Sequence, residues 1–215
     1  MKVCTDSCLF GAYIQTEKTS GKALDIGTGT GLLSLMLAQK SSIAIDAIDP
    51  DSSAVRQAKE NVLNSPWHNQ ITIYHTSLQD YKTQSRYDLI FSNPPFYKDH
   101  LKSKDHKYNT ACHSNLLPPE DLLDFVTEHL VEDGTFYILY PVREFDEFVK
   151  LAEKSTLYPS EIMSVRDRQG KPVIRKMGKF QKHKTVVKEK NISIKDGDAY
   201  SDDFRNLLKE YYLNF

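Results

Sequence analysis

The chain has 215 residues, enough for one α/β domain with a substantial core and too few for two ordinary domains. Hydrophobic residues (40%) and charged residues (27%) occur in the proportions of a soluble globular protein, and no stretch approaches the roughly eighteen uncharged apolar residues of a membrane span. The net charge of -1 leaves nucleic acid open as a partner, and three cysteines without zinc-ligand spacing indicate a reduced, cytoplasmic chain.

Strand and helix patterns alternate along the first half of the chain. Short apolar runs predict strands at residues 22–26, 43–48, 71–74 and 87–92. Apolar residues at helical spacing predict helices at residues 32–39 and 54–64, and either Ser52 or Ser53 is expected to cap the second. Alternation of this kind predicts a parallel, doubly wound sheet.

The second half begins with a long connection, residues 96–117, that has no apolar face. Connections of this length in compact domains are usually functional. The patterns that follow predict a helix at 118–131, a strand at 135–140 and a helix at 145–152. Strand patterns resume at 161–165, 173–180 and 185–194, and Ser201 is expected to cap a last amphipathic helix.

A glycine-rich loop follows the first strand, with glycine at Gly27, Gly29 and Gly31. Glycines let the backbone turn tightly and approach a ligand closely, because no Cβ intervenes. The spacing differs from that of the NAD fingerprint, and the charge of Asp25 would face a diphosphate in an NAD site. The same charge suits S-adenosylmethionine (SAM), whose amino and sulfonium groups are positive.

Two acidic residues follow the second strand. Asp49 lies about twenty residues after the glycine loop, where a carboxylate can accept hydrogen bonds from ribose hydroxyls. An acid at a helix N-terminus can instead be stabilised by the helix dipole, and Asp51 is the better candidate for that role. The two interpretations can both hold, each for a different residue.

The fourth strand ends in the tetrapeptide Asn93-Pro94-Pro95-Phe96. An exocyclic amine on a base is a poor nucleophile, and acceptors for both of its N–H groups would direct its lone pair at a methyl donor. Asn93 Oδ1 and the carbonyl of Pro94 are candidate acceptors, and the prolines stiffen the backbone that holds them. Phe96 and Tyr97 offer faces on which a flipped base can stack.

Basic residues gather in two places. Between residues 166 and 190 there are ten Lys or Arg residues and two acidic ones, and residues 98–107 form a second cluster directly after the tetrapeptide. Basic runs are often solvated surface. Two such clusters near a candidate site for methylating an amine favour binding to a phosphate backbone, and therefore a nucleic acid partner.

At this point the chain resembles a class I SAM-dependent methyltransferase, and more closely the bacterial tRNA1(Val) adenine-37 N6-methyltransferase family. The stretches that carry the resemblance are Met1-Lys2-Val3-Cys4-Thr5-Asp6, the glycine loop, Asn61-Val62-Leu63-Asn64-Ser65-Pro66-Trp67, the Asn93 tetrapeptide and the tail from Tyr200-Ser201 to Tyr211-Tyr212-Leu213-Asn214-Phe215. The glycine loop is common to SAM enzymes of this fold. The Ser-Pro-Trp corner and the tail are specific to the family.

The resemblance implies a Rossmann-like, seven-stranded, mostly parallel sheet with helices on both faces and an antiparallel last strand. It also implies a single domain over residues 1–215 with an N-terminus shorter than the family's, SAM as cofactor, and N6 of an adenine in the tRNA anticodon loop as methyl acceptor. The oligomeric state stays open.

The residues and the resemblance together predict the members of the site. The expected catalytic residues are Asn93, Pro94 and Phe96. The expected cofactor-binding residues are Lys2, Thr5, Asp6, Asp25, Gly27, Gly29, Gly31, Asp49, Ser77 and Asn93, and no metal is expected. The expected substrate-binding residues are Tyr97, Lys98, Lys171, Arg175 and Lys176.

Two positions depart from the family pattern. Ser77 stands where an aspartate commonly contacts the adenine of the cofactor, and Asp80 is nearby but out of register. Cys112 stands where the family tends to have an arginine. The alternatives that remain are an rRNA guanine-N2 methyltransferase, a protein glutamine methyltransferase, a non-catalytic RNA-binding Rossmann-like module and an NAD-linked oxidoreductase.

Overall fold

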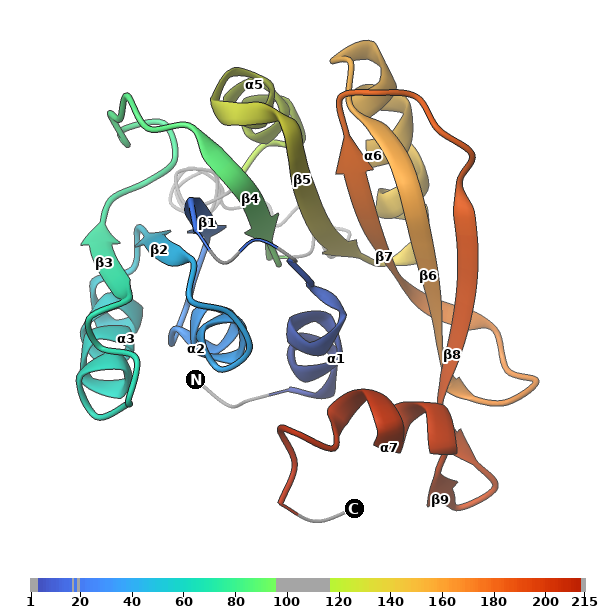
Figure 1. Cartoon of the computed structure of the whole chain (residues 1–215). Coiled ribbons are helices and arrows are strands. Elements are labelled where there is room, and N and C mark those ends of the chain that lie inside the picture. Colours follow the sequence, from blue (N-terminus) through green and yellow to red (C-terminus); the bar gives the residue numbers. More distant parts are fainter. Residues whose placement is uncertain (1–3, 17, 19, 96–116, 214–215) are drawn as a thin grey trace, which may run out of the picture.

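The computed structural model describes residues 4–16, 18, 20–95 and 117–213. In this part of the chain nine strands form one mixed sheet, in the order β3-β2-β1-β4-β5-β7-β6-β8-β9 (Figure 1). The described helices cover both of its faces. This is the predicted Rossmann-like α/β fold.

Five parallel strands form the first part of the sheet: β1 (Lys22–Ile26), β2 (Ala44–Asp49), β3 (Ile71–His75), β4 (Tyr87–Ser92) and β5 (Leu130–Tyr140). The chain moves outward from β1 to β3 and then returns to place β4 on the other side of β1. In such a sheet a crevice opens at the carboxyl ends of the strands where the order reverses. Ile26 pairs with Ser92, so β1 and β4 end at the same level, next to that crevice.

Four strands complete the sheet: β6 (Tyr158–Arg168), β7 (Val173–Gln181), β8 (Lys188–Asp196) and β9 (Ala199–Tyr200). β7 is antiparallel to both β5 and β6, as expected for the last strand of the seven-stranded arrangement. β8 then adds parallel to β6, and β9 adds antiparallel to β8. The described sheet therefore has nine strands and not seven, because the chain continues to pair along the open edge of β6.

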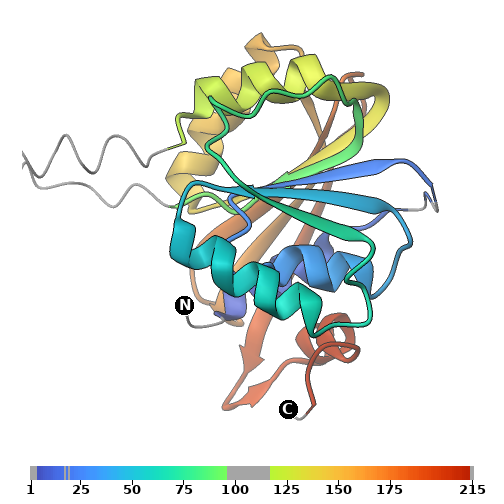
Figure 2. The same cartoon turned by 90° about the vertical axis from the view of Figure 1, so that its left-hand side faces the viewer.

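The helices divide between the two faces, as the edge-on view shows (Figure 2). One face packs against α1 (Thr5–Tyr13), α2 (Leu32–Ala38), α3 (Ser52–Leu63) and α7 (Asp202–Leu208), and the other against α5 (Pro119–His129) and α6 (Val142–Lys154). Each face has its own apolar core. None of the helices in the described ranges is long and apolar enough to cross a membrane.

Two local expectations need correction. The cap of α3 is Asp51 and neither Ser52 nor Ser53, because Asp51 Oδ1 accepts the backbone N–H groups of Ser53 (2.7 Å) and Ala54 (3.1 Å). The Ser53 hydroxyl donates to the same oxygen, which holds the pKa of the Asp51 carboxyl below its ordinary value. The helix expected at 118–131 ends earlier, because Leu130 already pairs with Tyr87 as the first residue of β5.

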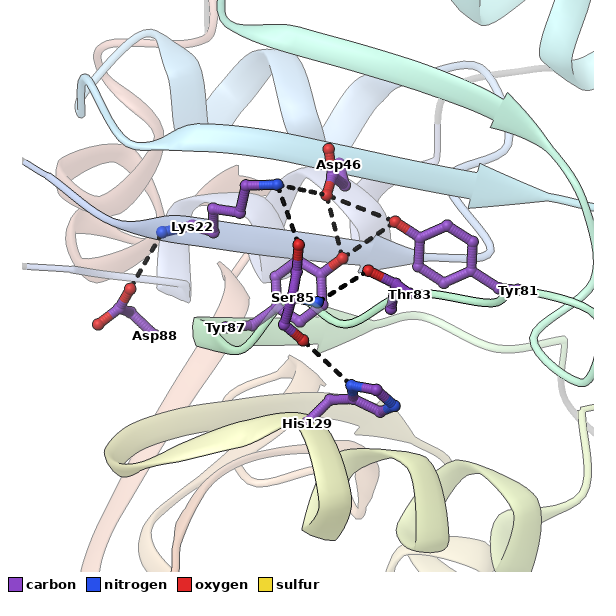
Figure 3. Close-up of polar contacts among 8 residues, drawn as sticks. All are labelled: Lys22, Asp46, Tyr81, Thr83, Ser85, Tyr87, Asp88 and His129. Atoms are coloured by element: carbon purple, nitrogen blue, oxygen red, sulfur yellow. Dashed lines mark hydrogen bonds and ion pairs between the residues drawn. The ribbon is translucent and has the colours of Figure 1, made fainter.

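A polar cluster ties the amino ends of the strands together (Figure 3). Asp46 on β2 accepts the hydroxyl of Tyr87 at 3.0 Å, the hydroxyl of Tyr81 at 3.4 Å and the ammonium of Lys22 at 3.4 Å. The ammonium of Lys22 also donates to the hydroxyl of Ser85. The cluster lies at the opposite ends of the strands from the crevice, so its role is to hold β1, β2 and β4 in register.

Candidate active site

A cavity of about 380 Å³ opens at the carboxyl ends of β1, β2, β3 and β4. Its walls are the glycine loop after β1, the turns after β2 and β3, residues 93–95 after β4, and Ser7 of α1. Each of the four strands therefore supplies one wall. The cavity lies where the sequence predicts the cofactor.

The glycine loop adopts a conformation that other residues rarely take. Gly27, Gly29 and Gly31 have φ angles of 75°, 57° and 81°, in the left-handed region that favours glycine. The N–H groups of Gly27 and Thr28 donate to the carbonyl of Ile48 at 2.9 and 3.0 Å, which joins the loop to β2. A Cβ on Gly27 would meet no atom of the described residues within 4 Å, so in this part of the chain the backbone there faces open space. The loop can therefore approach a ligand closely.

Gly31 differs from the other two glycines. It forms the N-cap of α2, and a Cβ there would lie 3.5 Å from the Cβ of Ala58 on α3. It does not line the cavity. The 3.5 Å distance is an ordinary van der Waals contact, so it is the left-handed φ at the start of α2 that favours glycine here.

Asp25 lies beneath the loop and is fully buried. Its Oδ2 accepts the hydroxyls of Thr28 and Ser34, both at 2.7 Å, whereas its Oδ1 has no hydrogen-bond partner among the described residues. Burial raises the pKa of the Asp25 carboxyl to about 6. Asp25 does not line the cavity, and its side-chain hydrogen bonds are with Thr28 of the loop and Ser34 of α2.

Asp49 ends β2 and lines the cavity. Its Oδ2 accepts the N–H of Gly29 at 2.8 Å, and its Oδ1 accepts the N–H of Asp51 at 2.8 Å. These bonds fix the carboxylate between the glycine loop and the start of α3. Each carboxylate oxygen keeps a further lone pair for a ribose hydroxyl.

The turn after β3 separates the two candidates for contact with the adenine of the cofactor. Ser77 lines the cavity, whereas Asp80 does not. The Ser77 hydroxyl donates to Asp80 Oδ2 at 2.7 Å and accepts the Asp80 N–H at 3.2 Å. Asp80 thus holds Ser77 in place, and of the two residues only Ser77 borders the space for a ligand.

Asn93 and Pro94 follow β4 and line the cavity. Since β4 lies on the other side of β1 from β2 and β3, they face the cavity from the side opposite Asp49 and Ser77. The Ser92 hydroxyl donates to the carbonyl of Ile26 at 2.8 Å and fixes the end of β4 to the end of β1. Asn93 Nδ2 donates to Ser7 Oγ at 3.1 Å, and Asn93 Oδ1 is buried with no partner in the described ranges. A buried acceptor without a partner is costly unless a ligand supplies a donor.

Other predicted residues lie elsewhere or outside the described ranges. Thr5 and Asp6 are in the first turn of α1 and do not line the cavity. Asp6 forms an ion pair with Arg175 of β7, at 2.8 Å between Asp6 Oδ2 and Arg175 Nε. Lys2, Phe96, Tyr97 and Lys98, and also Cys112, lie outside the residues that the structure describes.

The basic run over 166–190 does not form one surface. Lys171 lies exposed in the turn between β6 and β7, and Lys176 pairs with Asp146 at 2.7 Å near the carboxyl end of β5. β7 then carries the chain to the opposite end of the sheet, where Lys182 donates to the carbonyl of Thr127. Figure 1 shows the β6–β7 turn and the β7–β8 connection at opposite ends of these strands.

Ser7 is a member of the site that sequence reasoning missed. It follows the Thr5-Asp6 pair directly, and only the helical conformation of α1 turns it toward Asn93. The sequence signal for α1 is weak, because Cys8 through Tyr13 are all buried and no polar face alternates with an apolar one.

Comparison with known proteins gives a consistent result. The model of the methyltransferase small domain family matches residues 4–139. The tRNA1(Val) (adenine(37)-N6)-methyltransferase of Dyadobacter fermentans is 39% identical over 100% of this chain and 92% of its own length. The enzymes of the same name from Bacteroides fragilis and Vibrio campbellii are 39% and 34% identical, each over 99% of this chain, and over 91% and 89% of their own lengths.

Solved structures support the fold. A predicted O-methyltransferase from Agrobacterium tumefaciens is 12% identical, with a TM-score of 0.73 over 95% of this chain and 96% of its own. A putative RNA methyltransferase from Pyrococcus horikoshii is 16% identical, with a TM-score of 0.59 over 81% of this chain and 80% of its own. At these identities the likeness concerns the fold alone.

Proposed function

This chain belongs to the tRNA1(Val) (adenine(37)-N6)-methyltransferase family, and we propose that it methylates N6 of adenine 37 in the anticodon loop of tRNA1(Val), with SAM as the methyl donor. The observation that carries the proposal is Asn93, which lines the cavity and whose buried Oδ1 has no hydrogen-bond partner among the residues that the structure describes. An amine is the ligand group that such an acceptor suits.

The residues of the cavity fit SAM. The open backbone at Gly27 leaves room for the cofactor beside the loop, Gly29 lines the cavity, and Asp49 is positioned to accept ribose hydroxyls. Ser77 is the candidate contact for its adenine. When bound, SAM supplies a methyl group on a positive sulfur, and transfer forms a nitrogen–carbon bond while the carbon–sulfur bond breaks with its electron pair left on sulfur.

Asn93 and Pro94 hold the target amine in this proposal. Asn93 Oδ1 accepts one N–H of the amine and the carbonyl of Pro94 accepts the other, which directs the nitrogen lone pair toward the methyl donor. The nitrogen carries a positive charge after transfer, and its surplus proton then passes to water, so no strong base is needed. Phe96 and Tyr97 are proposed to stack on the flipped base.

The surface proposed for tRNA is smaller than the basic run in the sequence. Lys171 at the β6–β7 turn lies at the end of the sheet that also carries the cavity, together with Lys176 and Arg175. We propose that these residues and Lys98 contact phosphates, while the basic residues near the β7–β8 connection do not. We also place the protein in the cytoplasm, where its tRNA substrate occurs.

The test is analysis of modified nucleosides. Bulk tRNA is incubated with the protein and SAM carrying a labelled methyl group, then digested and analysed by mass spectrometry. Labelled N6-methyladenosine that maps to one anticodon loop is the expected result. Labelled N2-methylguanosine, or label in protein glutamine, would show that the related amine methyltransferases are the better assignment. Saturable SAM binding without any transfer would indicate a non-catalytic RNA-binding module.

A further inference from the structure

The side chain of Asn93 can present two different atoms to the cavity. Its oxygen accepts a hydrogen bond from the N–H of an amine. Its nitrogen carries only donor N–H groups, which would be repelled by the N–H groups of the amine. The two orientations differ by a rotation of the terminal amide and occupy almost the same volume. Shape alone therefore does not select the orientation that the reaction requires, and a hydrogen bond must do so.

Ser7 supplies that hydrogen bond. Its Oγ accepts Asn93 Nδ2 at 3.1 Å, which leaves Asn93 Oδ1 without a partner in the described ranges. Ser7 Oγ also lies 3.1 Å from Cys4 Sγ, a contact in which either the hydroxyl or the thiol can be the donor. In either case the serine oxygen keeps a lone pair for the amide nitrogen of Asn93.

The helix that carries Ser7 is fixed near both of its ends. Asp6, the neighbour of Ser7, is paired with Arg175 of β7 at 2.8 Å. At the other end of α1, Lys40 Nζ donates to the carbonyls of Gly11 at 2.9 Å and Ala12 at 3.2 Å. Since α1 is held against both the sheet and α2, the Ser7 hydroxyl has a defined position relative to the end of β4.

We propose that Ser7 is a positioning residue of the methyl-transfer site and that it acts through Asn93, by holding its amide with Oδ1 toward the amine. The inference rests on the proposed function, because it takes Asn93 as the acceptor of the target amine. It adds a residue from α1 to a site whose other proposed polar members come from the loops that follow the strands. It also gives Asp6 and Arg175 a role in placing α1.

The kinetic test is a double-mutant cycle with steady-state assays on tRNA. Ser7→Ala should lower kcat about tenfold, with KM for tRNA and the SAM dissociation constant changed less than about twofold, and Ser7→Thr should restore most of the loss because it keeps the hydroxyl. Asn93→Asp presents a carboxylate, which offers an acceptor oxygen in either orientation. In that background the effect of Ser7→Ala on kcat should shrink to less than about twofold. An equal effect in both backgrounds would show that Ser7 does not act through the amide.

A second measurement needs no turnover. In protein labelled with ¹⁵N, the side-chain amide signal of Asn93 is identified by its loss in Asn93→Asp. Exchange of its protons with water should accelerate at least about tenfold in Ser7→Ala. The matched control is Ser53→Ala, which removes a serine hydroxyl from the first turn of α3 that bonds to Asp51 and makes no bond to Asn93. That variant should leave the exchange rate unchanged.

The two measurements separate the inference from the proposed function. If the wild-type protein forms no N6-methyladenosine, the proposed function is wrong, and the exchange measurement still decides whether Ser7 holds the Asn93 amide. If the wild type is active but Ser7→Ala changes neither kcat nor exchange, the inference is wrong and the function stands. Unchanged exchange overturns the inference even if kcat falls.

Discussion

Replacing Asp25 with asparagine should stabilise the ligand-free protein at neutral pH. Asp25 is fully buried with one oxygen unpartnered among the described residues, and burial raises the pKa of its carboxyl from 3.8 to about 6. Each unit of that rise costs the folded, ionised protein about 1.4 kcal/mol, so the full cost above pH 6 is about 3 kcal/mol. Asparagine has the same shape and removes the charge.

The sign of the pH dependence follows from the same shift. Below pH 3.8 Asp25 is protonated in both the folded and the unfolded chain, so it costs nothing. Between pH 3.8 and about 6 the folded state holds the proton more tightly, and stability falls as the pH rises. The difference in unfolding free energy between Asp25→Asn and the wild type should therefore grow by about 2 kcal/mol from pH 4 to pH 8.

Thermal unfolding followed by circular dichroism, at several pH values and without ligand, measures this difference. For a domain of this size about 2 kcal/mol corresponds to roughly 5 °C in Tm. The matched control is Asp46→Asn, another buried aspartate, whose carboxylate accepts hydrogen bonds from Lys22, Tyr81 and Tyr87. That variant should lose stability at neutral pH. A gap between wild type and Asp25→Asn that does not change with pH would refute the reasoning.

Saturating SAM extends this experiment to the predicted cofactor role of Asp25. If a positive group of the cofactor approaches the unpartnered Oδ1, SAM should raise the Tm of the wild type more than that of Asp25→Asn. An equal rise in both proteins would leave Asp25 with its contacts to Thr28 and Ser34 and remove it from the cofactor-binding residues.

Asn93→Ala should lower kcat by about 10²- to 10³-fold, because the lost acceptor acts on the target amine. SAM affinity measured by calorimetry should stay within about threefold. Near-wild-type turnover would contradict the role given to Asn93. Lys171→Ala should weaken tRNA binding and reduce its salt dependence, whereas Lys184→Ala, in the β7–β8 connection, should change neither. Equal effects of the two substitutions would show that both lysines act only as general surface charge. Tyr87→Phe should lower the unfolding free energy by about 1 kcal/mol in urea titrations, because Asp46 loses a buried hydrogen bond. SAM affinity should not change. An unchanged urea midpoint would refute the role given to the polar cluster around Asp46.

The parts of the fold that sequence reasoning predicted well are those in which local pattern and tertiary packing agree. Strands β1 and β4 occupy the predicted residues, because each is a short apolar run with a polar or glycine end. The glycine loop and Asn93 follow these strands directly, so the strand order brings them together. The sequence does not decide between Ser77 and Asp80 after β3, because only the folded turn shows that Ser77 lines the cavity and that Asp80 bonds to Ser77 from outside the cavity.

Features set by contacts between distant segments were not predictable. Helix α1 is buried nearly all round, so its sequence has no amphipathic period, and the link from Ser7 to Asn93 joins residues 86 positions apart. The basic run looks continuous in sequence, but β7 crosses the whole sheet and separates Lys171 from Lys182. A strand of nine residues such as β7 spans about 30 Å, so basic residues before and after it in the sequence lie on different surfaces of the protein.

The edge formed by β8 has a consequence for self-association. β9 pairs only with Lys195 and Asp196, so among the described residues most of β8 has no strand paired along its outer side. The uncovered stretch begins Lys188-Glu189-Lys190, all exposed, directly after the exposed Val186 and Val187. Charged side chains on an open strand discourage its pairing with a strand of another molecule. The charged triplet therefore opposes edge-to-edge aggregation at a place where the two exposed valines would otherwise favour it.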